Sequence, residues 1–321
     1  MKDSYWSDKR VFVTGYEGFL GSWLTKVLIE KGARVIGLDN ARQRPLSILE
    51  GWRRKIKGIK GSVVSYRLIN RIFEKYRPEI VFHLAAQSIV GLAKRYPLKA
   101  LRVNVLGTAN LLEAARNMDC LEAMVVASSD KAYGSHRRLP YRETTPLKGE
   151  YPYDVSKASA DLICRAYFKT FKVPVGVTRC GNIYGPGDFH FSRIVPDAIR
   201  KALANEVFLI RSDGRFTRDY VFVSDIVSGY LLLARLMKKK HLAGGAFNFS
   251  NGKPVSVLTL VKKIYRLCQQ EPKYKILNQA KSEIRHQYLE AAKARRILSW
   301  RPEYGLTRGL KETIAWYRIH F

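Results

Sequence analysis

Short apolar runs alternate with helically spaced segments from the start of the chain to Arg179. The runs hold three to five residues and are rich in valine and isoleucine, which is typical of buried strands. The segments between them repeat apolar residues every three or four positions, which predicts amphipathic helices. The predicted strands are 11–13, 34–38, 80–84, 123–127 and 175–178, and the predicted helices are 19–31, 66–76, 98–118 and 153–171.

Buried strands separated by helices indicate a parallel sheet that is covered on both faces. The sequence therefore predicts an α/β fold with a doubly wound parallel sheet of Rossmann type. After Arg179 the alternation ends, and we assign 180–216 and 249–321 to a smaller α+β lobe at the carboxyl ends of the strands. Residues 1–179, with about 217–248 returning to them, form the predicted Rossmann domain. The later predicted elements are helices 191–205, 224–237, 257–269 and 306–317 and a strand at 217–223.

The chain is strongly basic, with 57 Lys and Arg against 27 Asp and Glu and a net charge of +30. Such an excess attracts polyanions, and residues 42–60 and 238–241 are its densest parts. The excess is otherwise spread along the chain and no nucleic-acid motif accompanies it, so we expect a globally basic surface and no specific nucleic-acid partner.

Other classes of protein are disfavoured by composition. No apolar run approaches the roughly 18 residues that span a bilayer, and the N-terminus has no apolar signal segment. The four cysteines lack metal or redox spacing, so we expect buried free thiols, no metal site and a cytoplasmic protein. These residues are Cys120, Cys164, Cys180 and Cys268.

A glycine-rich loop follows the first predicted strand. Gly15, Gly18 and Gly21 allow a tight turn and a close approach of a pyrophosphate to the N-terminus of the next helix. Asp39 ends the second predicted strand, where it is placed to accept hydrogen bonds from a ribose diol. Its charge would repel a 2′-phosphate, so we expect NAD. Arg42 and Arg44 nearby leave NADP as the minority alternative.

A tyrosine and a lysine lie four residues apart, at Tyr153 and Lys157, and so share one face of a helix. The lysine ammonium is expected to lower the pKa of the phenol and make it a usable base. Ser129 follows another predicted strand upstream. Together with the glycine loop, these residues indicate nicotinamide chemistry on a hydroxyl group, although Tyr153 and Lys157 alone could be a surface pair.

Several motifs resemble those of the extended short-chain dehydrogenases/reductases, the NAD-dependent epimerase/dehydratase family. They are the glycine loop, Leu84-Ala-Ala86, Asn104 with Gly107-Thr108, the Ser/Tyr/Lys set, and segments at 179–186, 218–225 and 297–302. Within the family, Ser129-Asp130-Lys131, His83-Leu-Ala-Ala-Gln87 and Trp6 with 18–24 are similar to the CDP-glucose 4,6-dehydratase branch. Leu20 and Ser62 depart from the usual residues of that branch and of the family.

The resemblance implies a sugar-nucleotide 4,6-dehydratase that forms a 4-keto-6-deoxy sugar through an internal NAD redox cycle, a lyase. Tyr153 would take the proton of the sugar 4-hydroxyl, Ser129 would bind the same oxygen, and Lys157 would hold the cofactor ribose. Asp130 would act as acid toward the leaving 6-hydroxyl, and Lys131 would take the carbon 5 proton. From the sequence alone, Asp130 and Lys131 could instead form a salt bridge in a loop.

The resemblance also implies the binding residues. The expected cofactor contacts are Gly15, Gly18, Phe19, Leu20, Gly21, Asp39, Asn40, Ser62, Val63, Leu84, Ala85, Ala86, Asn104, Ser128, Tyr153, Lys157 and Cys180. The expected substrate contacts are Gln87, Ser88, Asn182, Arg218 and Arg285. His83 lies inside an apolar run, so we interpret it as a core residue.

Two alternatives remain from the sequence. A 4-epimerase of the same family would share Ser129, Tyr153 and Lys157 but would not need Asp130 and Lys131. A catalytically idle member could bind an anionic polymer through its charge, although it would not need the Ser/Tyr/Lys set. The resemblance further predicts a homodimer that pairs helices 100–116 and 153–171 of each subunit.

Overall fold

A computed structural model describes residues 4–41, 46–280 and 283–321. A seven-stranded sheet forms its centre, with strand order β11-β6-β5-β4-β1-β2-β3, and every neighbouring pair is parallel. This confirms the predicted α/β fold of Rossmann type. The strands are β1 (Arg10–Thr14), β2 (Arg34–Asp39), β3 (Ile56–Lys60), β4 (Ile80–His83), β5 (Ala123–Ala127), β6 (Val175–Cys180) and β11 (Ala246–Phe249).

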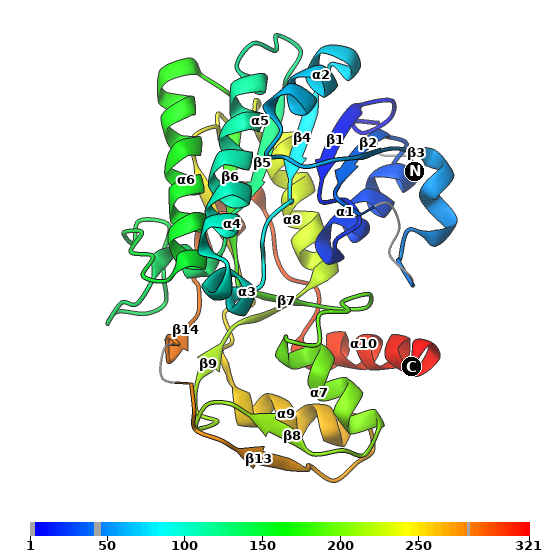
Figure 1. Ribbon diagram of the computed structural model, residues 1–321, viewed down its shortest axis with the longest axis vertical. Helices are drawn as coiled ribbons and strands as arrows, with labels where there is room; N and C mark the ends of the chain where they lie inside the picture. Colours follow the sequence, from blue (N-terminus) through cyan, green and yellow to red (C-terminus); the bar gives the residue numbers. More distant parts are fainter. Residues whose placement is uncertain (1–3, 42–45, 281–282) are drawn as a thin grey trace.

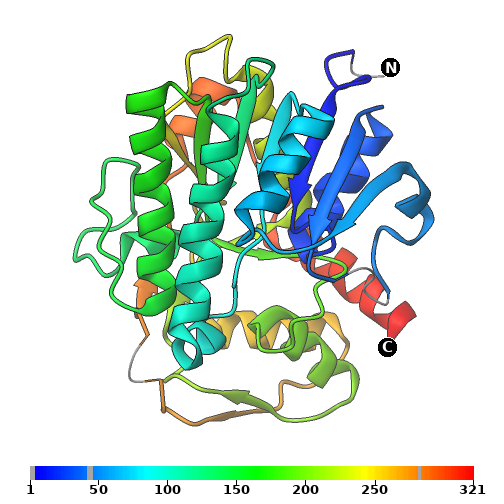
Figure 2. The ribbon, with the colours of Figure 1, turned by 45° about the horizontal axis from the view of Figure 1, so that its top comes forward.

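Helices cover both faces of this sheet (Figures 1 and 2). On one face, apolar residues of α1 (Phe19–Glu30) and α8 (Val223–Leu236) join those of the strands in one core cluster. On the other face, α2 (Tyr66–Tyr76), α5 (Gly107–Ala115) and α6 (Pro152–Phe171) build a second cluster. Burial of apolar side chains on both faces explains why the strand sequences are continuously apolar.

Short helices complete this half of the molecule. The segment before α5 contains α4 (Pro97–Leu101) and a π-helical turn, η2 (Arg102–Leu106), so the predicted helix 98–118 is a helix with a π turn that ends at Ala115. The remaining helices here are α3 (Val90–Arg95) and the 3-10 segments η1 (Glu50–Lys55) and η3 (Asp130–Tyr133).

Most of the chain after β6 builds the lower part of the molecule in Figure 1, around a third core cluster, with helices α7 (Ile194–Leu203), α9 (Val257–Leu267) and α10 (Leu306–His320). The exceptions are α8, β11 and a π-helical turn, η4 (Ala294–Leu298), whose buried side chains belong to the first cluster. The predicted strand 217–223 is in fact two strands, because the chain changes partners at Asp219. The small sheets pair β7 (Asn182–Tyr184) with β10 (Tyr220–Phe222), β9 (Thr217–Arg218) with β12 (Val255–Ser256) and β14 (His286–Gln287), and β8 (Phe208–Ile210) with β13 (Tyr274–Ile276).

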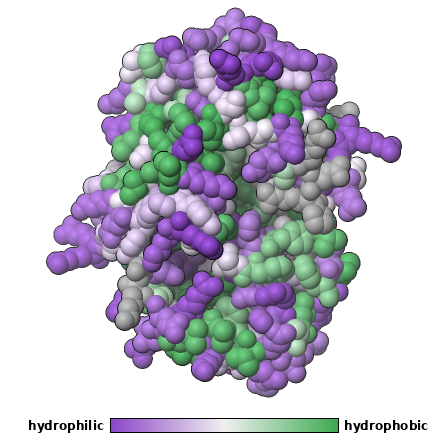
Figure 3. Space-filling model, in the orientation of Figure 1, coloured by the Kyte–Doolittle hydropathy of each residue, from purple (hydrophilic) through white to green (hydrophobic). Residues whose placement is uncertain are grey.

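The molecular surface is largely polar. Figure 3 shows hydrophilic side chains over most of one face, and hydrophobic ones gather where Figure 1 draws α5 and α6. No helix in the described ranges has the length and apolar character needed to cross a membrane. All four cysteines are free thiols, and Cys120 is part-exposed whereas the other three are buried as expected.

A buried ion pair ties α6 to the sheet. Arg179 of β6 makes two bonds to the Asp161 carboxylate, at 2.7 and 2.9 Å, and a third, at 2.9 Å, to the hydroxyl of Tyr133. Both charged side chains are less than a tenth exposed. Removing one member of such a pair leaves the other charge buried without compensation.

We therefore predict that Asp161→Ala lowers the free energy of unfolding by about 3–5 kcal/mol. The matched control is Asp119→Ala, because Asp119 pairs with Arg77 at 2.6 Å but both side chains are more than half exposed. That control should cost less than about 1 kcal/mol. Urea unfolding of both variants measures the difference, and equal losses would contradict the prediction.

Candidate active site

The glycine loop brings the N-terminus of α1 close to the loop after β4. Gly15 has a φ of 74°, and a Cβ atom there would lie 2.8 Å from the backbone nitrogen of Ala85. A Cβ atom on Gly21 would lie 2.0 Å from the Gly15 carbonyl oxygen. Side chains are thus excluded where the backbone must approach a ligand. Gly18 caps α1 without a side chain, so the helix presents backbone N–H groups suited to a diphosphate.

Asp39 lies at the end of β2, beside this loop. Its two carboxylate oxygens accept bonds of 3.1 Å from the backbone nitrogens of Glu17 and Ala41. These contacts fix the carboxylate at the carboxyl edge of the sheet, and Asn40 follows it on the surface. Next to it is a cavity of about 260 Å³, lined by Tyr16, Glu17, Ala41, Arg53, Ile56, Gly58, Ile59 and Lys60. Arg42 and Arg44, the residues of the NADP alternative, lie outside the described residues.

Asn104 holds the loop after β4 in place. Its side-chain oxygen accepts a bond of 2.7 Å from the Gln87 nitrogen, and its amide nitrogen donates to the Gln87 oxygen and to Ser156. Leu84, Ala85 and Ala86 precede Gln87 in this loop and are all part-buried. The structure therefore shows Asn104 as the residue that shapes the predicted cofactor loop.

His83 is a core residue, as the sequence indicates. Its ring nitrogens lie 2.7 Å from the hydroxyl of Thr14 and 3.0 Å from that of Thr108. Burial lowers the pKa of His83 to about 3, with a smaller contribution from Lys157. The ring is neutral at physiological pH and has no free nitrogen for acid–base chemistry.

Ser129 and Tyr153 meet at the carboxyl end of β5. Ser129 begins η3, accepts a bond of 3.2 Å from the Lys131 nitrogen and donates one of 3.0 Å to the Asp130 carboxylate. Its side chain also lies close to Tyr153 on α6, where it favours the phenolate. Lys157 lies one turn further along α6 and donates a bond of 2.8 Å to the Ala127 carbonyl. The predicted Ser/Tyr/Lys set is therefore assembled in space.

The expected effect of Lys157 on Tyr153 is corrected by the structure. Burial raises the pKa of Tyr153 to about 12, and the Ser129 side chain opposes this rise only in part. Burial also lowers the pKa of Lys157 to about 8. Desolvation of both groups thus outweighs the attraction that the spacing of the two residues predicts.

Asp130 is buried and Lys131 is part-buried, with opposite consequences for their pKa values. Burial raises the pKa of the Asp130 carboxyl and favours its protonated form. Burial, and then the nearby Arg218 charge, lowers the pKa of Lys131 and favours its neutral amine. The Lys131 Nζ atom donates a bond of 2.9 Å to the side-chain oxygen of Gln287. An acid and an amine in these states are suited to proton transfer.

Two residues near this pair were not predicted. Gln287 belongs to no motif, and it comes from β14, 156 residues after Lys131. Asp154 is buried beside Tyr153, and burial raises its pKa to about 6. Asp154 lies between Tyr153 and Lys157, so its position in that motif could have marked it as a site residue.

The predicted substrate residues lie on different elements. Asn182 is in β7, and Arg218 in β9 is buried and donates bonds of 2.9 and 3.0 Å to the carbonyls of Thr217 and Arg285. Arg285 is exposed, so only its backbone is joined to this group. The Ser88 hydroxyl lies 3.5 Å from Arg193, a cation that was not predicted.

The other predicted cofactor residues differ in exposure. Val63 and Cys180 are buried, and the Val63 carbonyl accepts a bond of 2.9 Å from Asn110. The Ser62 hydroxyl accepts from the Val64 nitrogen, and the Ser128 hydroxyl lies 3.4 Å from the Lys157 carbonyl. Phe19 and Leu20 open α1 and are part-buried.

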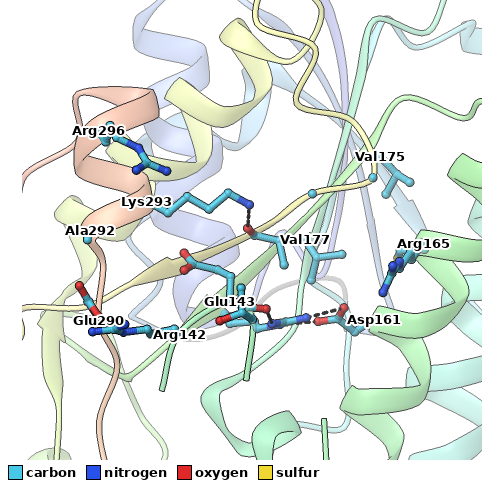
Figure 4. A pocket seen from close by; sticks show the side chains of 16 residues that line it. Arg142, Glu143, Asp161, Arg165, Val175, Val177, Glu290, Ala292, Lys293 and Arg296 are labelled. Carbon is cyan, nitrogen blue, oxygen red and sulfur yellow. Dashed lines mark hydrogen bonds and ion pairs between the residues drawn. The ribbon is translucent and has the colours of Figure 1, made fainter. Parts of the chain in front are cut away.

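A larger cavity, of about 710 Å³, lies at the β11 edge of the sheet (Figure 4). Its charged groups largely pair with one another or with the strand. Lys293 donates to the Ala246 carbonyl, Glu143 accepts from the Asn248 nitrogen, and Arg142 pairs with Glu290. These contacts satisfy the backbone of an edge strand, so we interpret the cavity as structural.

No group of three or more His, Cys, Asp or Glu residues in the described part of the chain could hold a metal ion.

Comparison with known proteins places this geometry in a family. The family model described as GDP-mannose 4,6-dehydratase matches residues 12–313. The chain belongs to this family. The CDP-glucose 4,6-dehydratase of Salmonella typhimurium is 31% identical over 331 residues, which cover 98% of this chain and 92% of that enzyme. The family resemblance inferred from the motifs is thereby confirmed.

The solved structures that are similar to this chain include sugar-nucleotide 4,6-dehydratases and 4-epimerases. DesIV of Streptomyces venezuelae, a dTDP-glucose 4,6-dehydratase solved with NAD bound, has a TM-score of 0.89 and 26% identity, covering 97% of each chain. The UDP-glucose 4-epimerase of Thermotoga maritima has a TM-score of 0.87 and 30% identity, covering 97% of this chain and 99% of that one. The fold is therefore shared by dehydratases and epimerases, and the site residues must distinguish them.

Proposed function

We propose that this protein is an NAD-dependent sugar-nucleotide 4,6-dehydratase, of the CDP-glucose type. The observation that carries the proposal is the pair of a buried Asp130 and a part-buried Lys131 beside Ser129 and Tyr153. Burial favours a protonated carboxyl and a neutral amine, the two states that elimination of water requires. The similar Salmonella enzyme supports the CDP-glucose type.

The glycine loop and Asp39 fit NAD. Backbone N–H groups of α1 would hold the diphosphate, Asp39 the adenosine ribose, and Lys157 the nicotinamide ribose. Bound NAD would supply a hydride acceptor for carbon 4 of the sugar and a donor that returns the hydride to carbon 6. The net reaction would then release water without net oxidation, as in a hydro-lyase.

The protein groups would move the protons. Tyr153, which lies beside Ser129, would take the proton of the 4-hydroxyl, and the ketone formed at carbon 4 would acidify the proton on carbon 5. Lys131 would take that proton as a neutral amine, and Asp130 would give its proton to the leaving 6-hydroxyl. Tyr153 and Asp130 are buried and Lys131 is part-buried, so access of water to these protons is reduced.

The test is incubation of the purified protein with CDP-glucose, dTDP-glucose, UDP-glucose and GDP-mannose. Mass spectrometry should detect loss of one water from one of them, with CDP-glucose expected to react fastest. An isomer of unchanged mass with inverted carbon 4 would instead support the second candidate, a 4-epimerase. The similarity to the Thermotoga maritima 4-epimerase is the observation that favours that candidate.

We predict that Asp39→Ala weakens NAD binding by about 10- to 100-fold, as expected when hydrogen bonds to a charged group are lost. The same variant should lose its preference for NAD over NADP, because the carboxylate no longer repels a 2′-phosphate. Isothermal titration with each cofactor measures both effects, with Glu30→Ala, at an exposed site at the far end of α1, as control. Tighter binding of NADP than NAD by the unaltered protein would overturn the assignment.

We also propose a homodimer. Exposed apolar side chains lie along the two helical segments that the resemblance assigns to the interface. They are Leu101 and Leu106 before α5 and Val155, Leu162 and Phe171 on α6. Burial of such a surface favours association of two copies.

We interpret the net charge of +30 as a general property of the surface, which predicts weak and salt-sensitive binding of polyanions.

A further inference from the structure

Gln287 links the C-terminal part of the chain to the proposed base. It lies in β14, which pairs in parallel with β9 so that Gln287 is opposite Arg218. Its side chain is fully buried, with an exposed fraction of 0%. A buried carboxamide normally has hydrogen-bond partners for both its oxygen and its nitrogen, so we expect a partner for each of these atoms in Gln287.

The oxygen has a partner and the nitrogen does not. Oε1 accepts the bond of 2.9 Å from Lys131 Nζ. Nε2 is buried and has no hydrogen-bond partner among the described residues. This orientation suits the ammonium form of Lys131, which has only donors, and it also leaves the lone pair of the amine form free to act as a base. The NH2 group is thus a buried donor beside the proposed reaction centre.

The charged groups around Lys131 explain why an uncharged hydrogen-bond partner favours its neutral form more than a carboxylate would. Asp130, Asp154 and Glu283 attract its positive charge, and Arg218 repels it. A carboxylate in place of Gln287 would add a further attraction and stabilise the ammonium. The amide oxygen instead accepts an N–H bond from the ammonium or from the amine, so it orients Lys131 in both states. In the amine, the lone pair then points away from Gln287.

We propose that Gln287 is a positioning residue for Lys131 and that its NH2 group donates a hydrogen bond to an oxygen of the bound hexose next to carbon 5. This inference rests on the proposed function, because it assigns the sugar as the missing acceptor. Lys131 takes the carbon 5 proton and becomes an ammonium, while Gln287 makes and breaks no covalent bond. Gln287 would thus bind the sugar through its NH2 group and orient the lone pair of Lys131 through its oxygen.

The first measurement needs no substrate. Reductive methylation of Lys131 by formaldehyde and cyanoborohydride, followed by peptide mass spectrometry across pH, reports the fraction of neutral amine. Gln287→Glu should move the midpoint upward by about 1 to 3 pH units, because an opposite charge within a few ångströms raises a lysine pKa. Gln279→Glu, an exposed site, is the matched control and should leave the midpoint unchanged. An unchanged midpoint in Gln287→Glu would overturn the positioning role.

The second measurement uses CDP-glucose in deuterated water. Gln287→Met keeps the size of the side chain but removes both polar atoms. We expect its KM to rise several-fold and deuterium uptake at carbon 5 to fall about tenfold or more, while oxidation at carbon 4 stays within threefold. In Gln287→Glu, the pH dependence of that uptake should shift upward with the methylation midpoint.

The outcomes separate the inference from the proposed function. If the unaltered protein releases no water from any sugar nucleotide, the proposed function fails, whereas the methylation midpoint still decides whether Gln287 controls Lys131. If the unaltered protein reacts but Gln287→Met keeps the KM and carbon 5 exchange of the parent, the contact to the sugar is refuted. An equal loss at carbon 4 and carbon 5, with a lowered melting temperature, would show that Gln287 is merely structural.

Discussion

Tyr153→Phe is expected to reduce turnover of the sugar nucleotide by at least about 100- to 10,000-fold, the usual worth of a general base. The variant keeps the ring that fills the buried site and removes only the hydroxyl beside Ser129. Dehydratase and epimerase chemistry both begin by removing the proton of the 4-hydroxyl. The loss should therefore appear whichever of the two reactions the protein performs.

The measurement is the rate of substrate consumption by mass spectrometry at saturating NAD. Tyr151→Phe is a suitable control, because Tyr151 precedes α6 by one residue and is 36% exposed. That control should retain the parent rate, and both variants should unfold at the parent temperature. A Tyr153→Phe enzyme with the parent rate would remove Tyr153 from the mechanism.

The pH dependence of the parent provides a further check on this residue. Burial raises the pKa of Tyr153 to about 12 in the protein alone, so the phenol is protonated at neutral pH. The positive charge of an oxidised nicotinamide would favour the phenolate. The Tyr153 pKa should therefore be lower in the NAD complex than in the free protein, as an ultraviolet titration of both forms would show.

The sequence predicted the elements that carry local patterns. Strand β5 and helix α2 have the predicted bounds, because each is a continuous apolar run or an amphipathic repeat. Strand β3 was missed since Ile56 and Ile59 are separated by Lys57 and Gly58, and this edge strand is only half-buried. Strand β11 was missed because four residues that include Asn248 give no clear period.

The site residues also differ in this way: some were predicted from local motifs, whereas others come together only through the fold. Ser129, Tyr153 and Lys157 were predicted from motifs, and the structure brings them to one end of the sheet. Their ionisation could not be predicted, because spacing along a helix does not report burial. Gln287 is 156 residues from Lys131 and reaches it only through the pairing of β14 with β9. Such a contact leaves no mark in the sequence near either residue.

Lys131→Ala and Asp130→Asn provide the experiment that distinguishes a dehydratase from an epimerase. Only the dehydratase must remove the carbon 5 proton and expel the 6-hydroxyl, the steps assigned to these two residues. Each substitution should slow water loss by about 100- to 10,000-fold, while oxidation at carbon 4 still occurs. Lys148→Ala, an exposed lysine on the loop that contacts η3, should leave the rate unchanged.

Isotope placement makes this result specific. In deuterated water the unaltered enzyme should place deuterium at carbon 5 of a 4-keto-6-deoxy product, because the proton that Lys131 removes exchanges with solvent. Lys131→Ala should suppress that label together with water loss, whereas Asp130→Asn should suppress water loss and still allow exchange at carbon 5. A product of unchanged mass with inverted carbon 4, formed equally well by Lys131→Ala, would reject the dehydratase in favour of the epimerase.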